Sequence, residues 1–206
     1  MAEKFYAVKR GLKTGIFCTW EECSASVKGY SGAVYKSFKT RQEALDFLDG
    51  NAGRKENESA EDKNGVKIYV DGSYHAETEE FSYGMVVLDG KKEEKYSQKF
   101  QDKELASMRN VAGEIKGAEA AMQYALDHGL TEIAIYHDYE GIARWPLGEW
   151  KTNKEGTRAY KNFYEQACMQ VKIRFVKVTG HSNDKYNDMA DELAKEALGI
   201  NDSAGK

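Results

Sequence analysis

The sequence is poor in the residues that interrupt regular structure or cross-link a chain. Its 206 residues include one proline and three cysteines, and 41% of them are hydrophobic. This composition favours a globular protein with a hydrophobic core over a disordered chain. The cysteines are odd in number and lack the paired spacing of a zinc site, so we expect free thiols in a reducing compartment. They are Cys18, Cys23 and Cys168.

Long apolar runs are also missing. The sequence has no stretch of about 18 consecutive apolar residues, the length of a membrane-spanning helix. The first residues, MAEKFYAVKR, lack the apolar segment of a secretion signal. These absences argue against membrane insertion and secretion. We therefore expect a cytoplasmic protein that has no membrane partner and acts as a monomer.

A large net charge is lacking as well, because the formal charge at pH 7 is −4. The charges are unevenly distributed along the chain. Residues 1–41 carry eight Lys and Arg against three acids, whereas residues 51–206 carry 22 against 28. A basic segment joined to an acidic one is a weak indication of nucleic-acid binding. The acidic part is also compatible with carboxylates gathered around a metal ion.

Residues 1–49 predict a small module with the element order ββαβα. Two short apolar strands flank a basic turn at Gly11–Gly15, and a third strand lies between two short helices. A threonine precedes each helix, and Glu43 has the spacing of a capping box behind Thr40. The expected elements cover residues 5–9, 16–20, 20–27, 34–38 and 40–48, with Thr19 as the cap of the first helix.

Aromatic and cationic side chains are interleaved through this module. Aromatic rings offer faces to bases and sugars while cations meet phosphates, so the mixture is suited to nucleic-acid binding. The same rings could instead fill a thin core, and composition does not decide between the two interpretations. The residues are Tyr6, Lys9, Arg10, Lys13, Trp20, Lys28, Tyr30, Tyr35, Lys36, Phe38 and Lys39.

Residues 50–64 predict a flexible linker. The segment has many charges, no hydrophobic period and no strand-forming run. A helical spacer is the alternative, but Gly50 and Gly53 disfavour it. A flexible tether would raise the local concentration of substrate around the main domain without fixing the geometry of the two parts.

Residues 65–200 predict a mixed α/β domain. Its first strand, within Val66–Ser73, alternates apolar and polar residues and stops at Asp71 and a glycine. An antiparallel meander and a long helix with an apolar stripe follow. The next strand should run parallel to the first, and it ends at Asp138. The further expected ranges are 83–88, 95–100, 105–126, 131–137, 139–145, 156–169, 171–178 and 184–198, the last capped by Asn183 or Asp184, before a tail at 201–206.

Four carboxylates of this domain could meet at one edge of the sheet. Parallel strands that end in Asp71 and Asp138 place both at the edge where open α/β sheets bind ligands. Glu114 lies beside the apolar stripe of the long helix, and Asp188 and Asp191 lie on the last helix. Hard cations such as Mg²⁺ or Mn²⁺ would relieve their repulsion. Two ions about 4 Å apart could activate a water and stabilise the leaving oxygen of a phosphodiester. An ordinary Asp-Gly turn and a solvated helix glutamate are the alternatives.

The N-terminal module resembles a known domain. The run FYAVKRGLKTGIFCTWEEC, followed by VKGYSGAVYKSF and EALDF, is similar to the hybrid-binding domain at the N-terminus of many type 1 ribonucleases H. Ser37 stands where that family often has a second lysine, which implies one weaker phosphate contact. The resemblance implies that an RNA/DNA hybrid is contacted by Tyr6, Trp20, Tyr35 and Lys36.

The main domain resembles the catalytic domain of the same family. The segments YVDGS, RNVAGEIKGAEAA, IAIYHD and VTGHSNDKYNDMADELA are similar, in order, to the four acidic motifs of type 1 ribonuclease H. The resemblance implies a ribonuclease H-like mixed five-stranded sheet with flanking helices. It implies metal binding by Asp71, Glu114, Asp138 and Asp191, with Asp188 as a competitor for the fourth place. It also implies that His181 assists product departure or proton transfer, that Asn110 reads the minor groove of the hybrid, and that Ser73 forms a wall against the RNA strand.

Several positions on the substrate side depart from the family pattern. Arg109 and Val111 stand where polar residues often serve the substrate, Tyr139 replaces a common serine, and Glu140 replaces a frequent base-contacting glutamine. The short span between Asp138 and the strand expected at residue 171 has no room for the extra helix and basic loop with which some family members grip the hybrid. The N-terminal module would then supply that grip.

The implied function is an endonuclease that cuts the RNA strand of RNA/DNA hybrids and leaves 5′-phosphate and 3′-hydroxyl ends. Mg²⁺ is the expected cofactor, with Mn²⁺ as a substitute. Selectivity would come from sensing 2′-hydroxyls on one strand and the DNA backbone on the other. A non-catalytic hybrid-binding protein with the same fold is the alternative, although a pure binder gains little from clustered negative charge near phosphates. A polynucleotide transferase or resolvase of the same fold is disfavoured by the hybrid-binding module.

Overall fold

The structure is a computed structural model that describes residues 4–17, 19–38, 41–48, 65–90, 92–178 and 184–200. The chain divides into two compact units. The expected linker at 50–64, the expected tail at 201–206 and the expected cap Thr40 lie outside the described residues. No helix among the described residues is both long and apolar enough to span a membrane.

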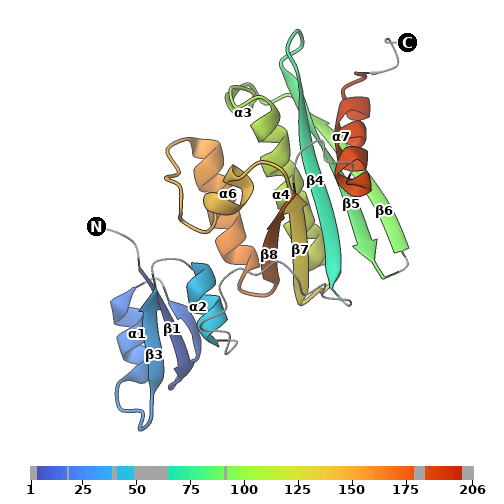
Figure 1. The fold of residues 1–206 in the computed structure, drawn as a ribbon. Helices are drawn as coiled ribbons and strands as arrows, with labels where there is room; N and C mark the ends of the chain where they lie inside the picture. Colours follow the sequence, from blue (N-terminus) through green and yellow to red (C-terminus); the bar gives the residue numbers. More distant parts are fainter. Residues whose placement is uncertain are drawn as a thin grey trace. The chain divides into compact units, whose positions relative to one another are not determined.

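The N-terminal unit is a small sheet with two helices (Figure 1). Its elements are β1 (Phe5–Arg10), β2 (Gly15–Phe17), α1 (Trp20–Val27), β3 (Val34–Phe38) and α2 (Arg41–Leu48). The sheet is antiparallel with the order β2-β1-β3, and the element order is the predicted ββαβα. The side chain of Thr19 accepts the amide of Glu22 and caps α1, as predicted. Phe5 and Ala7 of β1 form a small core with Ala44 of α2.

The larger unit is built on a five-stranded sheet (Figure 1). Its elements are β4 (Val66–His75), β5 (Glu80–Asp89), β6 (Lys92–Phe100), α3 (Lys103–Ala106), α4 (Asn110–Asp127), β7 (Glu132–His137), α5 (Gly141–Arg144), α6 (Glu155–Ala167), β8 (Lys172–Lys177) and α7 (Lys185–Ala197). The strand order is β6-β5-β4-β7-β8. The strands β4, β5 and β6 form an antiparallel meander, while β7 runs parallel to both β4 and β8. This is the predicted mixed sheet, although β5 and β6 begin earlier than expected. The expected strand end at Asp71 is wrong, because β4 continues through Gly72 and stays paired with β5 as far as His75.

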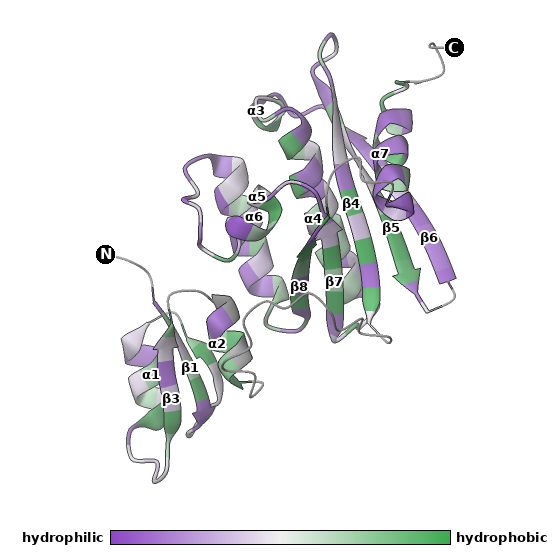
Figure 2. Cartoon of the chain, in the orientation of Figure 1, coloured by the Kyte–Doolittle hydropathy of each residue, from purple (hydrophilic) through white to green (hydrophobic). Residues whose placement is uncertain are grey.

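Helices cover both faces of this sheet. Gly72 of β4 lies against the backbone of α4, whereas Gly84 of β5 lies against that of α7. Gly84 pairs with Asp71, so these two residues share the face that α7 covers. The central strands are therefore enclosed on both sides. In Figure 2, β5 is largely hydrophobic, β4 has hydrophobic and hydrophilic bands, and the edge strand β6 is largely hydrophilic.

One expected helix is two helices in the structure. The apolar stripe predicted a continuous helix over residues 105–126, but α3 ends at Ala106 and α4 begins at Asn110. Arg109 lies between them with φ 54°, outside the right-handed α region, and this backbone conformation stops a helix. The interruption lets the first residue of α4 lie against β4, close to Gly72.

The start of α7 agrees with one of the two predicted caps. The side chain of Asp184 accepts the backbone amides of Tyr186 and Asn187, at 3.1 and 3.4 Å. The alternative cap, Asn183, lies outside the described residues. This cap fixes the first turn of α7, which carries Asn187 and Asp188.

Gly84→Ala is expected to destabilise the larger unit. A Cβ atom at Gly84 would lie 2.0 Å from the carbonyl oxygen of Ala190 and 2.8 Å from the amide nitrogen of Ala194. Both are backbone atoms of α7, so the helix would have to move away from the sheet, at a cost on the order of 1–3 kcal/mol. Urea unfolding measures the loss. Gly65→Ala is the matched control, because its Cβ would meet only a guanidinium nitrogen at 4.0 Å. Equal stability of the two variants would contradict the close approach of α7.

Candidate metal centre

Two parallel strands bring two aspartates to one edge of the sheet. The register of β4 and β7 runs as far as the pair Tyr69 and Tyr136. Asp71 and Asp138 follow two residues beyond these tyrosines. The two carboxylates therefore lie side by side just beyond the end of the β4–β7 pairing, while β4 itself continues beside β5 to His75. The carboxyl ends of parallel strands are where α/β sheets bind ligands.

Glu114 reaches the same edge from α4. A Cβ atom at Gly72 would lie 2.4 Å from the amide nitrogen of Glu114 and 2.4 Å from the carbonyl oxygen of Asn110. Only glycine permits this approach of strand to helix. As a result, Asp71, Glu114 and Asp138 each offer a carboxylate oxygen, and these atoms all lie within 4.8 Å of one another.

Water has little access to these carboxylates. Asp71 is 9% and Glu114 7% exposed. Burial, followed by the charge of Asp138, raises the pKa of Asp71 to about 7, even though the amide of Gly72 donates a 2.7 Å hydrogen bond to it. Burial, followed by the charges of Asp138 and Asp71, raises the pKa of Glu114 to about 9. Without a cation, the cluster therefore favours protonated over fully ionised carboxyl groups.

The donor set fits a hard divalent cation. The Oε2 atom of Glu114 is buried and has no hydrogen-bond partner in the part of the chain that the structure describes. Lys195, whose charge lowers the pKa of Asp71, is itself paired with Asp191 at 2.9 Å. Closely spaced carboxylate oxygens are the ligands that Mg²⁺ and Mn²⁺ prefer. Asp71, Glu114 and Asp138 thus form an acidic metal-binding triad.

The helix α7 supplies another wall of this site. Together with the triad and Asn110, three of its residues, Asn187, Asp188 and Asp191, line a cavity of about 160 Å³, which we call the acidic cavity. Asn187 is buried, and its Oδ1 atom has no hydrogen-bond partner among the described residues. Neither Asp188 nor Asp191 belongs to the 4.8 Å group. Of these two, Asp191 is the one whose charge helps to raise the pKa of Asp71.

The other residues expected near the cleavage site have different surroundings. Asn110 is the first residue of α4, is exposed, and lines the acidic cavity. Ser73 is buried in β4, where it pairs with Ser82 of β5. His181 lies outside the described residues.

A cationic cavity of about 410 Å³ adjoins the acidic one. Arg109, Lys151 and Lys154 line it together with Tyr139 and Trp145. Arg109 directly precedes Asn110 and Tyr139 directly follows Asp138, so the linings of the two cavities are continuous along the chain at these positions. Sequence reasoning noted Arg109 and Tyr139 only as departures and did not single out the two lysines. The sequence feature that could have indicated them is the K-x-x-K spacing of Lys151 and Lys154 directly after Trp150.

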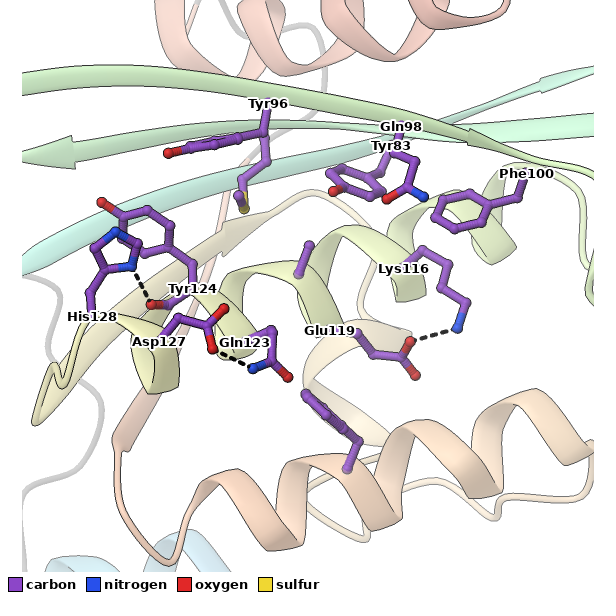
Figure 3. A pocket seen from close by; sticks show the side chains of 13 residues that line it. Tyr83, Tyr96, Gln98, Phe100, Lys116, Glu119, Gln123, Tyr124, Asp127 and His128 are labelled. Carbon is purple, nitrogen blue, oxygen red and sulfur yellow. Dashed lines mark hydrogen bonds and ion pairs between the residues drawn. The ribbon is translucent and has the colours of Figure 1, made fainter.

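A larger cavity, of about 480 Å³, lies further along α4 and is lined by aromatic and polar side chains of β5, β6 and α4 (Figure 3). Its carboxylates have local partners. Glu119 pairs with Lys116 at 2.8 Å, and Asp127 accepts a 2.8 Å hydrogen bond from Gln123. This cavity has no cluster of carboxylates like the triad, so the smaller acidic cavity is the candidate site.

The N-terminal unit presents aromatic rings to solvent. The ring centroids of Tyr6 and Trp20 lie 5.7 Å apart, and those of Trp20 and Tyr35 lie 6.1 Å apart. Trp20 is 51% and Tyr35 44% exposed. Lys36, the residue after Tyr35 on β3, is also exposed, and its ammonium group lies over the ring of Phe38. The rings of Trp20 and Tyr35 are therefore not the core of the module, which Phe5 and its neighbours form. Of the two sequence interpretations, a core role does not hold for Trp20 and Tyr35, whereas Phe38 does pack against the core.

The metal-free protein is expected to lose stability as pH rises from about 4 to about 9. The folded pKa values of Asp71 and Glu114 are raised above their ordinary values, so the folded state binds these protons more tightly than the unfolded chain. The stabilisation by these bound protons is complete below the pKa values of the unfolded chain. It is lost as pH rises to the folded pKa values, about 7 for Asp71 and about 9 for Glu114. We expect a loss on the order of 2 kcal/mol. Denaturant unfolding in EDTA measures it, and Glu114→Gln should make the profile flatter. A profile unaffected by Glu114→Gln would contradict the assigned burial.

The fold and the site together define a class of protein. Clustered carboxylates just beyond the end of a parallel strand pairing are typical of metal-dependent enzymes that act on phosphodiesters. A family model described as "RNase H" matches residues 62–199, and one described as "Ribonuclease H1 N-terminal domain" matches residues 4–48. The chain therefore belongs to the ribonuclease H family of enzymes.

Individual relatives agree with this assignment. Human ribonuclease H1 is 26% identical over 253 residues, which cover 93% of this chain and 88% of that protein. A ribonuclease H of Clostridium botulinum is 27% identical over 144 residues, 65% of this chain and 95% of that protein. The crystal structure of RNase H1 from Halobacterium salinarum is similar with a TM-score of 0.56 and 21% identity, covering 67% of this chain and all of that one. The structure of LC11-RNase H1 in complex with an RNA/DNA hybrid is similar with a TM-score of 0.52 and 17% identity, covering 65% of this chain and 99% of that one.

Proposed function

We propose that this chain is an endonuclease that hydrolyses the RNA strand of RNA/DNA hybrids by two-metal-ion catalysis and leaves 5′-phosphate and 3′-hydroxyl ends. The observation that carries the proposal is the clustering of Asp71, Glu114 and Asp138 within 4.8 Å, in a chain of the ribonuclease H family. The hybrid bound to the related LC11-RNase H1 supports the substrate class.

The metal would be Mg²⁺, with Mn²⁺ as a substitute, held by the triad and by Asp191 as the fourth carboxylate. When bound, such ions activate a water and stabilise the leaving oxygen of a phosphodiester. The chain itself holds the carboxylates at short separations in a poorly solvated cavity. Because the pKa values of Asp71 and Glu114 are raised, ions must displace protons from them, so metal binding should strengthen as pH rises.

Residues around the acidic cavity would orient the hybrid. We assign contact with the minor groove to Asn110, which is exposed at the start of α4. We assign contact with phosphates to the cations Arg109, Lys151 and Lys154, which line the cationic cavity. Discrimination of RNA would rest on 2′-hydroxyls, the groups that distinguish it from DNA. His181 is proposed to assist product departure or proton transfer.

The two parts of the chain would have different functions, binding of the hybrid and its cleavage. We assign hybrid binding to residues 1–49, a tether to residues 50–64 and catalysis to residues 65–200. Exposed rings suit stacking on bases and sugars, and the exposed cation of Lys36, the next residue of β3 after Tyr35, suits a phosphate. Binding at the first part would keep hybrid near the second.

The alternative hypothesis is that the chain is a non-catalytic hybrid-binding protein. The buried Oε2 atom of Glu114, without a hydrogen-bond partner among the described residues, speaks against it. Three clustered acids would repel phosphates and destabilise the fold, and nothing is gained from them unless cations bind.

The test is a substrate panel of equal length. A labelled RNA/DNA hybrid, an RNA duplex and a DNA duplex are each incubated with the full chain and Mg²⁺, and the product ends are analysed. We expect cleavage of only the RNA strand of the hybrid, with 5′-phosphate ends. Cleavage of the DNA duplex at a similar rate, or binding of hybrid without cleavage, would reject the proposal.

A further inference from the structure

Three tyrosines form an aromatic layer on the face of the sheet that α7 covers. The rings of Tyr69 on β4 and Tyr136 on β7 are stacked, with centroids 4.4 Å apart and planes inclined by 20°. The ring of Tyr186, in the first turn of α7, lies 5.4 Å from that of Tyr69. Tyr69 is buried with Val86 and Ala190, and the other two tyrosines pack against this cluster. One aromatic cluster thus joins two strands and a helix.

The position of this layer relative to the carboxylates is specific. Tyr69 and Tyr136 are the final residue pair of the parallel β4–β7 ladder, and each lies two residues before an aspartate of the triad. Because strand side chains alternate, Tyr69 shares a face of β4 with Asp71. Asp138 is the first residue after β7, two positions beyond Tyr136. Tyr186 directly precedes Asn187 and Asp188, which line the acidic cavity.

We propose that Tyr69, Tyr136 and Tyr186 are positioning residues that set the separation of the metal ligands. The described ladder between β4 and β7 stops at the stacked pair, so the strands diverge beyond it and admit the carboxylate of Glu114. The stacked rings belong to the last residue pair of this ladder before Asp71 and Asp138. The contact between the rings of Tyr186 and Tyr69 holds the start of α7 against the same residue pair. The inference rests on the proposed metal function and adds the residues that give the cavity its width.

Magnesium makes the separation of ligands critical. It demands near-ideal octahedral geometry at about 2.0–2.1 Å, so small displacements of a carboxylate weaken its binding. A purely structural role of the tyrosines predicts a loss of stability and nothing else. A positioning role predicts, in addition, a loss of Mg²⁺ affinity and of turnover, without a matching loss of hybrid affinity.

Tyr136→Ala tests this role, because it removes one ring of the stack and leaves Asp138 unchanged. We expect the Mg²⁺ concentration for half-maximal thermal stabilisation to rise by roughly 10-fold or more, as for groups that orient metal ligands. The kcat should fall while KM for the hybrid stays nearly constant. Tyr136→Leu retains apolar volume without the ring and serves if the alanine variant is too unstable. Tyr136→Phe retains the ring and should restore the Mg²⁺ dependence of the unaltered chain.

Leu88→Ala is the matched control. Leu88 packs against the same cluster, but it pairs with Lys67, four residues before Asp71. This variant should melt at a lower temperature and keep the Mg²⁺ midpoint of the unaltered chain. Unchanged midpoints in Tyr136→Ala and Tyr136→Leu would overturn the positioning role and leave the proposed function intact. Absence of any Mg²⁺ stabilisation in the unaltered chain would overturn both.

Discussion

Asp71→Asn is expected to lower the single-turnover rate of hybrid cleavage by roughly 10³-fold at saturating Mg²⁺, because several kcal/mol of transition-state stabilisation depend on the bound ions. Asparagine keeps the shape of the side chain but removes one of three clustered negative charges. The pKa of Asp71 is raised because a charged carboxylate is costly to bury and is repelled by Asp138. A neutral asparagine at this position removes both costs. The metal-free variant should therefore be at least as stable as the unaltered chain.

The control for this prediction is another aspartate at a strand end. Asp89 is the last residue of β5, is exposed, and does not line the acidic cavity. Asp89→Asn should cleave hybrid at the rate of the unaltered chain, and circular dichroism should show the same fold for both variants. An Asp71→Asn protein that retains full activity would rule out Asp71 as a metal ligand.

Trp20→Ala is expected to weaken hybrid binding by the full chain roughly 10- to 100-fold, since stacking of an aromatic side chain on nucleic acid contributes about 1–3 kcal/mol. Trp20 lies between Tyr6 and Tyr35 in the exposed ring cluster, so its removal breaks both ring contacts. Turnover at saturating substrate should change little, because the acidic cavity belongs to the other unit. Fluorescence anisotropy with labelled hybrid in EDTA measures the affinity without cleavage.

Tyr30→Ala distinguishes a local effect from a general loss of aromatic surface. Tyr30 is an exposed ring of the same module that makes no ring contact with Trp20. Its removal should leave hybrid affinity nearly unchanged. Equal losses in the two variants would show that the cluster has no special role, and no loss in either would assign hybrid binding elsewhere.

Much of the fold could be predicted because local patterns determine it. The alternation in β4 marks a strand, and a helix before the next strand predicts the parallel pair that brings in Asp138. The turn predicted after Asp71 was wrong, because pairing with β5 keeps β4 extended as far as His75. Capping chemistry located the starts of α1 and α7 at Thr19 and Asp184. These features depend on neighbours in the sequence, which is why one sequence is sufficient for them.

Other features depend on contacts between distant residues and were missed. The break before α4 arises from the backbone of Arg109, which the apolar stripe does not record. The same sequence pattern suits a buried or an exposed Trp20, and only packing decides between them. The cationic cavity unites Arg109 with Lys151 and Lys154, which are separated by some 40 residues of sequence, so no local motif contains it.

The most direct test of the acidic cavity as a metal-dependent cleavage site is the Mg²⁺ dependence of hybrid cleavage by the full chain. A hybrid labelled on its RNA strand is incubated with protein in Mg²⁺, in EDTA, and in EDTA followed by excess Mg²⁺. The proposed function predicts RNA cleavage in the first and third samples and an intact strand in the second, with the DNA strand intact throughout. Equal cleavage in EDTA, or an intact RNA strand in Mg²⁺, would contradict it.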